Sequence, residues 1–157
     1  SARRVAGAQS RITHYSDISA GACELTAAIL AELISGKHWD EARRVPPDPG
    51  WPDPVRGIDP SATWSDRPCD SVSSSGFVID TLEAALWAVD TTSGFAEALL
   101  RAVNLGDDAD SVGAVTGQLA GARYGLSAIP EAWRRDLVDS QKIERLGRAL
   151  FNAGLAG

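Results

Sequence analysis

Three aspartates fall within four positions, at Asp107, Asp108 and Asp110, and a hydroxyl follows at Ser111. Apolar residues recur at helical spacing from Val112 onward, so this acidic cluster opens a predicted helix. One aspartate there can accept hydrogen bonds from free backbone N–H groups as a helix cap. The helix dipole stabilises each of the three aspartates by about 0.3 to 1 kcal/mol. Alternatively, the crowded carboxylates and the hydroxyl form a set of hard oxygen ligands for Mg²⁺ or Mn²⁺. The spacing leaves both capping and metal binding open.

The helix that must carry this cluster has a glycine at every fourth position, at Gly113, Gly117, Gly121 and Gly125. Each glycine costs roughly 1 kcal/mol of helix propensity relative to alanine. The stripe therefore predicts that a neighbouring backbone packs closely against it. We expect a buried central helix over about residues 108–124, with the three aspartates at its N-terminus.

Helical periodicity dominates the other long segments, and no stretch alternates as a strand would. It predicts a helix over residues 16–36 and one that follows the turn at residues 73–76 and ends near residue 91. A third helix is expected after an N-cap at Ser93, and a last one over about residues 138–151. The predicted fold class is all-α.

A proline-rich segment separates the first two predicted helices, because six of the eight prolines lie within residues 46–60. Proline lacks an N–H donor, so regular secondary structure is not expected there. Trp39, Trp51 and Trp64 lie in or beside this segment and would be costly to expose to water. We therefore expect an ordered loop over residues 46–68 that packs on the helices or over a site.

The composition limits the classes of partner and compartment. The length of 157 residues allows one domain, and 15 Lys and Arg against 21 Asp and Glu give a net charge of −6. An acidic chain without a basic cluster is not expected to bind nucleic acid or an anionic membrane, and its apolar runs are too short to span a bilayer. Cys23 and Cys69 are not spaced as metal ligands, which favours reduced thiols in the cytoplasm.

Three stretches of the sequence resemble the ADP-ribosylglycohydrolase family. Residues 104–125, followed by Ile-Pro-Glu-Ala-Trp at residues 129–133, closely resemble its C-terminal signature. Residues 10–14 are similar to its Ser/Thr-His segment, and residues 75–87 are similar to the stretch before its metal motif. The resemblance implies orthogonally packed helices around a binuclear Mg²⁺ or Mn²⁺ site. It also implies hydrolysis of the bond between the anomeric carbon of ADP-ribose and a protein side chain or small acceptor.

By motif match, the resemblance implies that Asp108, Asp110 and Ser111 are metal ligands. Asp107 stands where many relatives have a second glycine, and we expect only a capping or supporting role for it. If the cations are bound, they would hold the ribose hydroxyls and acidify a water molecule.

The resemblance also implies substrate contacts at His14, Ser75, Gly76 and Phe77. His14 would lie near the substrate, and the ring of Phe77 would meet the adenosine part. The turn that holds Ser75 and Gly76 enters a helix, where backbone N–H groups could hold the pyrophosphate. A surface histidine, a core aromatic residue and a plain turn are the alternatives for these positions.

One part of the family pattern is missing from these 157 residues. The family's Gly-Asp-rich opening and its Thr-Asp-Asp motif supply further metal ligands and the catalytic carboxylates, and neither occurs here. The chain also contains no methionine. We therefore expect the C-terminal half of the fold, with the catalytic residues in an N-terminal half, which a separate chain could carry. We expect these residues alone to bind metal weakly without turnover. A catalytically silent ADP-ribose-binding or structural protein is the alternative.

Overall fold

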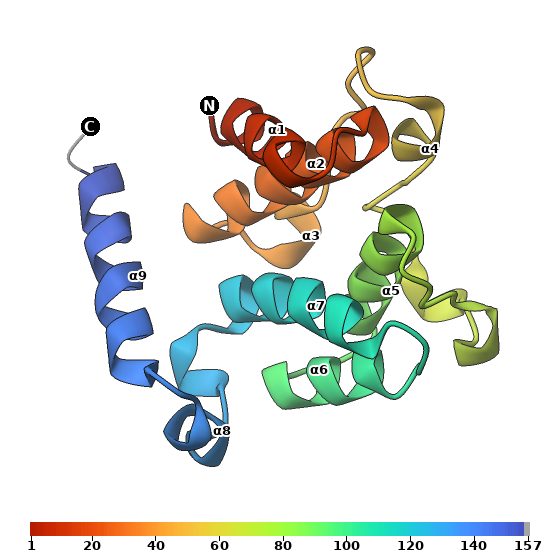
Figure 1. Ribbon diagram of the computed structural model, residues 1–157. Coiled ribbons are helices and arrows are strands. Elements are labelled where there is room, and N and C mark those ends of the chain that lie inside the picture. The colour runs from red at the N-terminus through yellow and green to blue at the C-terminus, as the bar shows by residue number, and fades with distance from the viewer. Residues whose placement is uncertain (156–157) are drawn as a thin grey trace.

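A computed structural model describes residues 1–155, and within that range the chain forms helices and turns but no strand. The prediction of an all-α fold is confirmed (Figure 1). The six longer helices in this range are α1 (Ala2–Thr13), α2 (Asp17–Ile34), α5 (Val78–Asp90), α6 (Phe95–Val103), α7 (Ala109–Tyr124) and α9 (Ser140–Leu155). Shorter elements are α3 (Trp39–Ala42), α4 (Asp53–Arg56), α8 (Glu131–Asp136) and the 3-10 turns η1 (Trp64–Asp66), η2 (Cys69–Ser71) and η3 (Leu126–Ala128).

Helices α5 and α7 form the centre of the bundle, because they pack against each other and each also packs against α2 and α6 (Figure 1). Eight of the 13 residues of α5 are buried, whereas α7 buries five of 16. The sequence explains the difference: α5 carries apolar residues on nearly every face, while α7 presents Ala114 and Gln118 to solvent. The expectation that residues 108–124 form a central helix is confirmed, since α7 packs against α6, α5 and α2, but α7 is less buried than α5.

The glycine stripe of α7 faces α6, as its spacing predicts. A Cβ atom added at Gly113 would lie 2.9 Å from Cγ1 of Val103, which is too close for any side chain. At Gly117 and Gly121 the added Cβ would lie 3.8 Å and 3.9 Å from α6 side chains, in ordinary contact. Gly125 ends the helix with φ +81°. Only Gly113 is therefore required by a lack of space.

Most predicted helix boundaries agree with the structure, with two differences. The N-cap of α6 is Gly94 and not Ser93. The backbone N–H and the hydroxyl of Ser93 instead donate to Oε2 of Glu97, one turn into the helix. Helix α1 was not predicted; it packs on α2 through small residues such as the buried Gly7, while its larger apolar residues, Val5 and Ile12, are exposed.

The proline-rich segment is ordered and packs on the helices. Trp39, Trp51 and Trp64 expose only 6%, 6% and 2% of their surface, which confirms that they are buried. The expectation of no regular structure is wrong for α4, a single turn with Pro54 near its start. A proline is tolerated there because the first N–H groups of a helix have no helical partner.

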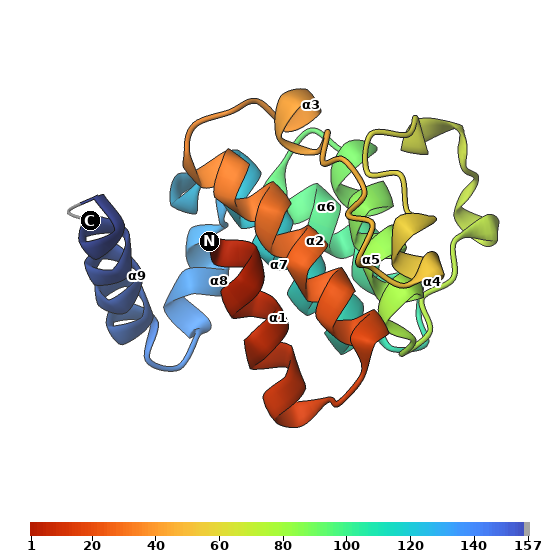
Figure 2. The ribbon, with the colours of Figure 1, turned by 90° about the horizontal axis from the view of Figure 1, so that it is seen from above.

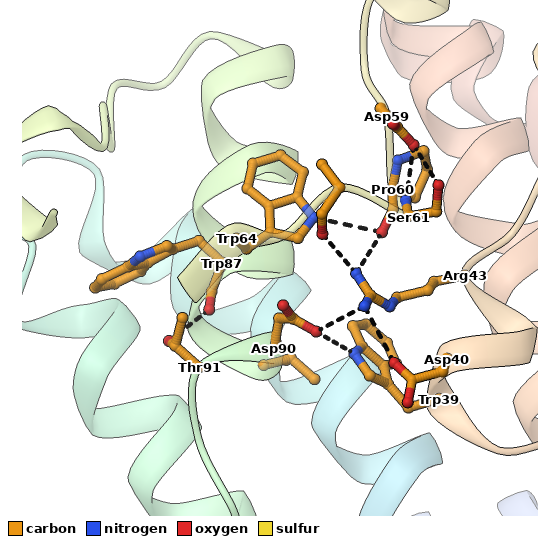
Figure 3. A network of polar contacts seen from close by, with 12 residues as sticks. Trp39, Asp40, Arg43, Asp59, Pro60, Ser61, Trp64, Trp87, Asp90 and Thr91 are labelled. Carbon is orange, nitrogen blue, oxygen red and sulfur yellow. Dashed lines mark hydrogen bonds and ion pairs between the residues drawn. The ribbon is translucent and has the colours of Figure 1, made fainter. Parts of the chain in front are cut away.

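Arg43 fastens this segment to the end of α5 (Figure 3). One guanidinium nitrogen donates to the carbonyl oxygens of Pro60 and Ala62, at 3.1 Å and 2.8 Å. The other lies 3.4 Å from Oδ1 of Asp90, and Trp39 Nε1 donates to the same oxygen at 2.8 Å. The loop is thus anchored at the C-terminal end of α5, away from the acidic cluster.

Helix α9 stands away from the bundle in both views (Figures 1 and 2). Its apolar residues are aligned as predicted, but they do not face the described core. Ile143, Leu146, Leu150 and Phe151 expose 53%, 59%, 65% and 50% of their surface.

Two further expectations concern the membrane and the cysteines. None of the helices in residues 1–155 is long and apolar enough to cross a bilayer. Cys23 and Cys69 are both free thiols, as expected.

Candidate metal and substrate site

A sharp turn between α6 and α7 sets the direction of the acidic cluster. Gly106 has φ +89° and Asp107 has φ +46°, so two successive residues adopt the left-handed region. Glycine enters this region freely, and aspartate tolerates it better than most residues. The turn leaves Asp107 exposed and makes Asp108 the N-cap of α7. Asp107 therefore does not occupy the N-cap position.

Asp108 occupies the capping position, but its carboxylate does not cap. Within the described residues, its side chain accepts no hydrogen bond from the N–H groups of the first turn. Its own N–H donates to the carbonyl oxygen of Ser74 at 3.1 Å. Its carboxylate lies against Gly76, where an added Cβ would be 2.7 Å from Oδ2. The capping explanation thus does not account for this carboxylate.

Hydrogen bonding with the neighbouring Asp108 side chain is the main cause that lowers the pKa of Asp110, and N–H groups at the helix start add to it. Oδ1 of Asp110 accepts from the backbone N–H of Ser111 at 3.0 Å. Two neighbouring carboxylates repel each other, and a cation between them would remove this repulsion.

The donor set fits Mg²⁺ or Mn²⁺ in chemistry and is incomplete in number. Asp108, Asp110 and the hydroxyl of Ser111 offer only hard oxygen atoms, and Asp110 and Ser111 are exposed. Among residues 1–155, however, no group of three or more His, Cys, Asp or Glu side chains could hold a metal ion. Because Mg²⁺ takes about six oxygen ligands, further donors must come from water, substrate or other protein residues.

Residues 73–77, which we call the serine turn, lie beside this cluster and are tied to the first turn of α5. The hydroxyls of Ser73 and Ser75 both donate to Oδ2 of Asp80, at 2.8 Å and 2.6 Å. Oγ of Ser75 accepts from the N–H of Phe77 at 3.1 Å, and the Thr81 hydroxyl donates to the Ser75 carbonyl at 3.2 Å. The turn is therefore held by side chains, and the N–H of Phe77 already has a partner.

Phe77 is the N-cap of α5, and its ring is 49% exposed. The alternative of an ordinary core aromatic residue is wrong. Its neighbour Gly76 touches Asp108, so the exposed ring is held close to the acidic cluster. A flat apolar face at this place can stack on an aromatic ligand.

His14 lies at the other predicted end of the site, as the C-cap of α1. It is exposed and lines a groove of about 460 Å³ that α1, α2, α5 and α7 enclose. Val78, directly after Phe77, lines the same groove, as do Val115 and Gln118 of α7. These two lie one and two turns beyond Ser111 on the same helix face. The groove has the volume of a small-molecule site. Of the predicted site residues, His14 lines it, whereas the described lining does not include Ser75, Gly76, Phe77, Asp108, Asp110 or Ser111.

Sequence reasoning missed Asp80 and Gln118. Asp80 holds the serine turn, and Gln118 lines the groove. An acidic residue in the first turn of a helix that follows several serines is the pattern that could have identified Asp80. Gln118 is an exposed polar residue on a glycine-rich helix, and nothing in its spacing marks it.

A second hollow, of about 690 Å³, lies along the outer side of α5 and α6, with Arg67 and Arg101 in its lining. Arg67 pairs with Glu83 at 3.0 Å, and Arg101 pairs with Glu97 at 3.4 Å. Its positive charges are thus already neutralised. The groove beside the acidic cluster is the stronger candidate.

Comparisons with known proteins identify the family. A sequence model of the ADP-ribosylglycohydrolase family matches residues 1–156. The ADP-ribosylarginine hydrolase Tri1 of Serratia proteamaculans (strain 568) is 46% identical over 144 residues, which cover 91% of this chain and 38% of that protein. A glycohydrolase of ADP-ribosyl dinitrogen reductase from Rhodospirillum rubrum is 33% identical over 149 residues, covering 95% of this chain and 47% of that one.

A solved structure described as an ADP-ribosylglycohydrolase-related protein complex matches the fold with a TM-score of 0.82 and 36% identity. The matched region covers 96% of this chain and 52% of the chain in that structure. The chain therefore spans less than half the length of these two curated relatives, and about half of the solved structure.

Proposed function

The chain belongs to the ADP-ribosylglycohydrolase family, and from this we propose that it is part of a hydrolase that releases ADP-ribose from a protein side chain or small acceptor. The bond cleaved would be the glycosidic bond at the anomeric carbon. Since one relative is named for ADP-ribosylarginine, arginine is the first acceptor to test. The observation that carries the proposal is the placement of Asp108 at the start of α7, where its carboxylate lies against Gly76 and has no capping role among the described residues.

The proposal includes Mg²⁺ or Mn²⁺, in a binuclear site, as the cofactor. Asp108, Asp110 and Ser111 would hold the metal through oxygen atoms, which these ions prefer. When bound, such ions polarise hydroxyl groups and lower the pKa of water. This chain's own part would be to present the two carboxylates at the start of α7, the helix whose Val115 and Gln118 line the groove.

The substrate would lie along the groove between the acidic cluster and His14. The half-exposed ring of Phe77 would stack on the adenine base, and His14 would hydrogen-bond to the ribose. The backbone N–H groups of Ser75 and Gly76 stand at the start of α5, where the helix dipole favours the pyrophosphate. These contacts would let an acidic protein bind an anionic ligand.

We further propose that the remaining ligands and the catalytic carboxylate come from the part of the family fold outside these 157 residues, in the same or a separate chain. The relatives extend well beyond the matched region. The exposed apolar side chains of α9 support this idea, as do Val5 and Ile12 on α1, which expose 63% and 81% of their surface. Such faces are normally covered by another element. A cytoplasmic location also remains part of the proposal.

The test is hydrolysis of an ADP-ribosylarginine peptide by the full-length protein with Mg²⁺ or Mn²⁺. Asp108→Asn and Asp110→Asn should each lower kcat/KM by about 100-fold, since a metal contribution of several kcal/mol is lost. Asp107→Asn is the matched control and should keep activity within a few-fold, because the same change lies one residue outside the proposed ligand set.

Two outcomes would count against this proposal. Turnover by the 157 residues alone would refute the idea that catalytic groups lie elsewhere. ADP-ribose binding that needs no metal, and that is equal in wild type and an Asp108→Ala, Asp110→Ala double variant, would favour a silent binding protein.

A further inference from the structure

We propose that Asp80 is a positioning residue for Asp108, acting through the serine turn. The inference rests on the proposed function, because it gives Asp80 a task toward a proposed metal ligand. Asp80 is not among the described residues that line the groove, so a direct role in substrate binding is not invoked.

The first link is between Asp80 and the turn. A single oxygen of Asp80, Oδ2, accepts from the hydroxyls of both Ser73 and Ser75. This arrangement fixes the residues on either side of Ser74, which is itself buried with 3% of its surface exposed. Hydrogen bonds to a charged acceptor are about twice as strong as neutral ones. Asp80 thus determines where the Ser74 carbonyl points.

The second link is between the turn and Asp108, which it contacts at two places. The Ser74 carbonyl accepts the Asp108 N–H at 3.1 Å, which locates the backbone. Gly76 lies against the carboxylate so closely that a Cβ would come within 2.7 Å of Oδ2. The turn therefore fixes both the position of the residue and the direction of its side chain.

Asp108 needs this support because its own segment does not hold it. The two preceding residues, Gly106 and Asp107, are in the left-handed region. Within the described part of the chain the Asp108 carboxylate makes no capping bond. Outer partners that orient metal ligands typically change metal affinity by about 10- to 100-fold when mutated.

The test measures Mn²⁺ binding by the full-length protein, using electron paramagnetic resonance of free Mn²⁺. Asp80→Ala should raise the Mn²⁺ dissociation constant by about tenfold or more. Asp80→Asn keeps an acceptor oxygen for the two serines and should recover most of the affinity. Asp70→Ala is the matched control, since Asp70 is exposed in η2 and has no hydrogen-bond partner within residues 1–155; it should bind Mn²⁺ as wild type does.

A second variant approaches Asp108 from the other contact. Gly76→Ala places a methyl group at the carboxylate and should also weaken Mn²⁺ binding about tenfold. Gly94→Ala is its control, because no described atom lies within 4 Å of the added Cβ. This pair keeps the inference testable even where Asp80→Ala does not fold.

The outcomes separate this inference from the proposed function. If Asp80→Ala and Gly76→Ala bind Mn²⁺ as tightly as wild type while Asp108→Ala does not, the inference is overturned and the proposed function stands. A lower melting temperature with an unchanged dissociation constant would give Asp80 only a helix-stabilising role, which also overturns it. A wild-type protein that neither binds Mn²⁺ nor hydrolyses substrate would refute the proposed function itself.

Discussion

Replacing Asp90 by alanine should destabilise the protein strongly, because it leaves Arg43 buried beside an empty position. The side chains of Arg43 and Asp90 expose only 13% and 11% of their surface. Trp39 would also lose the acceptor of its Nε1 hydrogen bond, which is 2.8 Å long (Figure 3). The fold would then contain a buried cation whose remaining carboxylate partner is the exposed Asp40, and an unpaired donor.

The expected loss in the free energy of unfolding is about 3 kcal/mol. Removing one member of a buried ion pair costs about 3 to 5 kcal/mol. The lower end applies because Arg43 keeps the carbonyl acceptors of Pro60 and Ala62. Asp40 offers a matched comparison, since it pairs with the same guanidinium nitrogen but is 75% exposed. Asp40→Ala should cost less than about 1 kcal/mol.

Urea unfolding followed by tryptophan fluorescence measures both variants. Asp90→Asn, which retains an acceptor for Trp39, should fall between Asp90→Ala and wild type. Adding Arg43→Met to Asp90→Ala should restore part of the stability, because the buried charge is then gone. Equal losses for Asp90→Ala and Asp40→Ala would refute the argument from burial.

Two smaller perturbations follow from the packing of α7. Gly113→Ala should lower the free energy of unfolding by about 1 to 3 kcal/mol, because its methyl group would meet Val103 at 2.9 Å. Gly147→Ala on α9, where no described atom lies within 4 Å of the added Cβ, should instead raise the free energy of unfolding by about 0.5 to 1 kcal/mol. Thermal denaturation measures both variants. Burial raises the pKa of Tyr124 above its ordinary value of 10.0, so its contribution to stability is complete below pH 10 and is lost as the pH rises through the raised value. Tyr124→Phe should therefore flatten the alkaline fall in stability. Because the chain has a second tyrosine, Tyr15, the ionisation of Tyr124 is measured as the difference in absorbance at 295 nm between wild type and Tyr124→Phe, and ionisation at or below pH 10 in this difference would contradict the prediction.

Much of the fold could be predicted because the helices that form the core have strong apolar periods. Leu25 and Ile29 in α2, and Leu82 and Val89 in α5, are buried as their spacing predicts. The buried tryptophans of the proline-rich loop follow from the cost of exposing large rings. By contrast, α1 packs through small residues, and short α4 depends on a proline that is harmless at a helix start. The packing of these elements does not follow from a buried stripe of large apolar residues.

The candidate site could be predicted only in part. The acidic cluster was visible because Asp108 and Asp110 are close in sequence, but spacing could not separate a cap from a ligand. The direction of the Asp108 carboxylate decides this, and it depends on Gly76, more than thirty positions earlier. Contacts of this kind arise from tertiary packing, which no local pattern encodes.

The apolar side of α9 also bears on how these 157 residues behave by themselves. Leu146 and Leu150 are exposed to water on this helix, and each Å² of exposed apolar surface costs about 25 cal/mol of free energy relative to burial. A net charge of −6 makes copies of the chain repel each other at low protein concentration. The exposed apolar face of α9 nevertheless favours self-association as the protein concentration rises. As long as no other polypeptide segment covers this apolar face, chaperones and proteases would bind the chain first at α9.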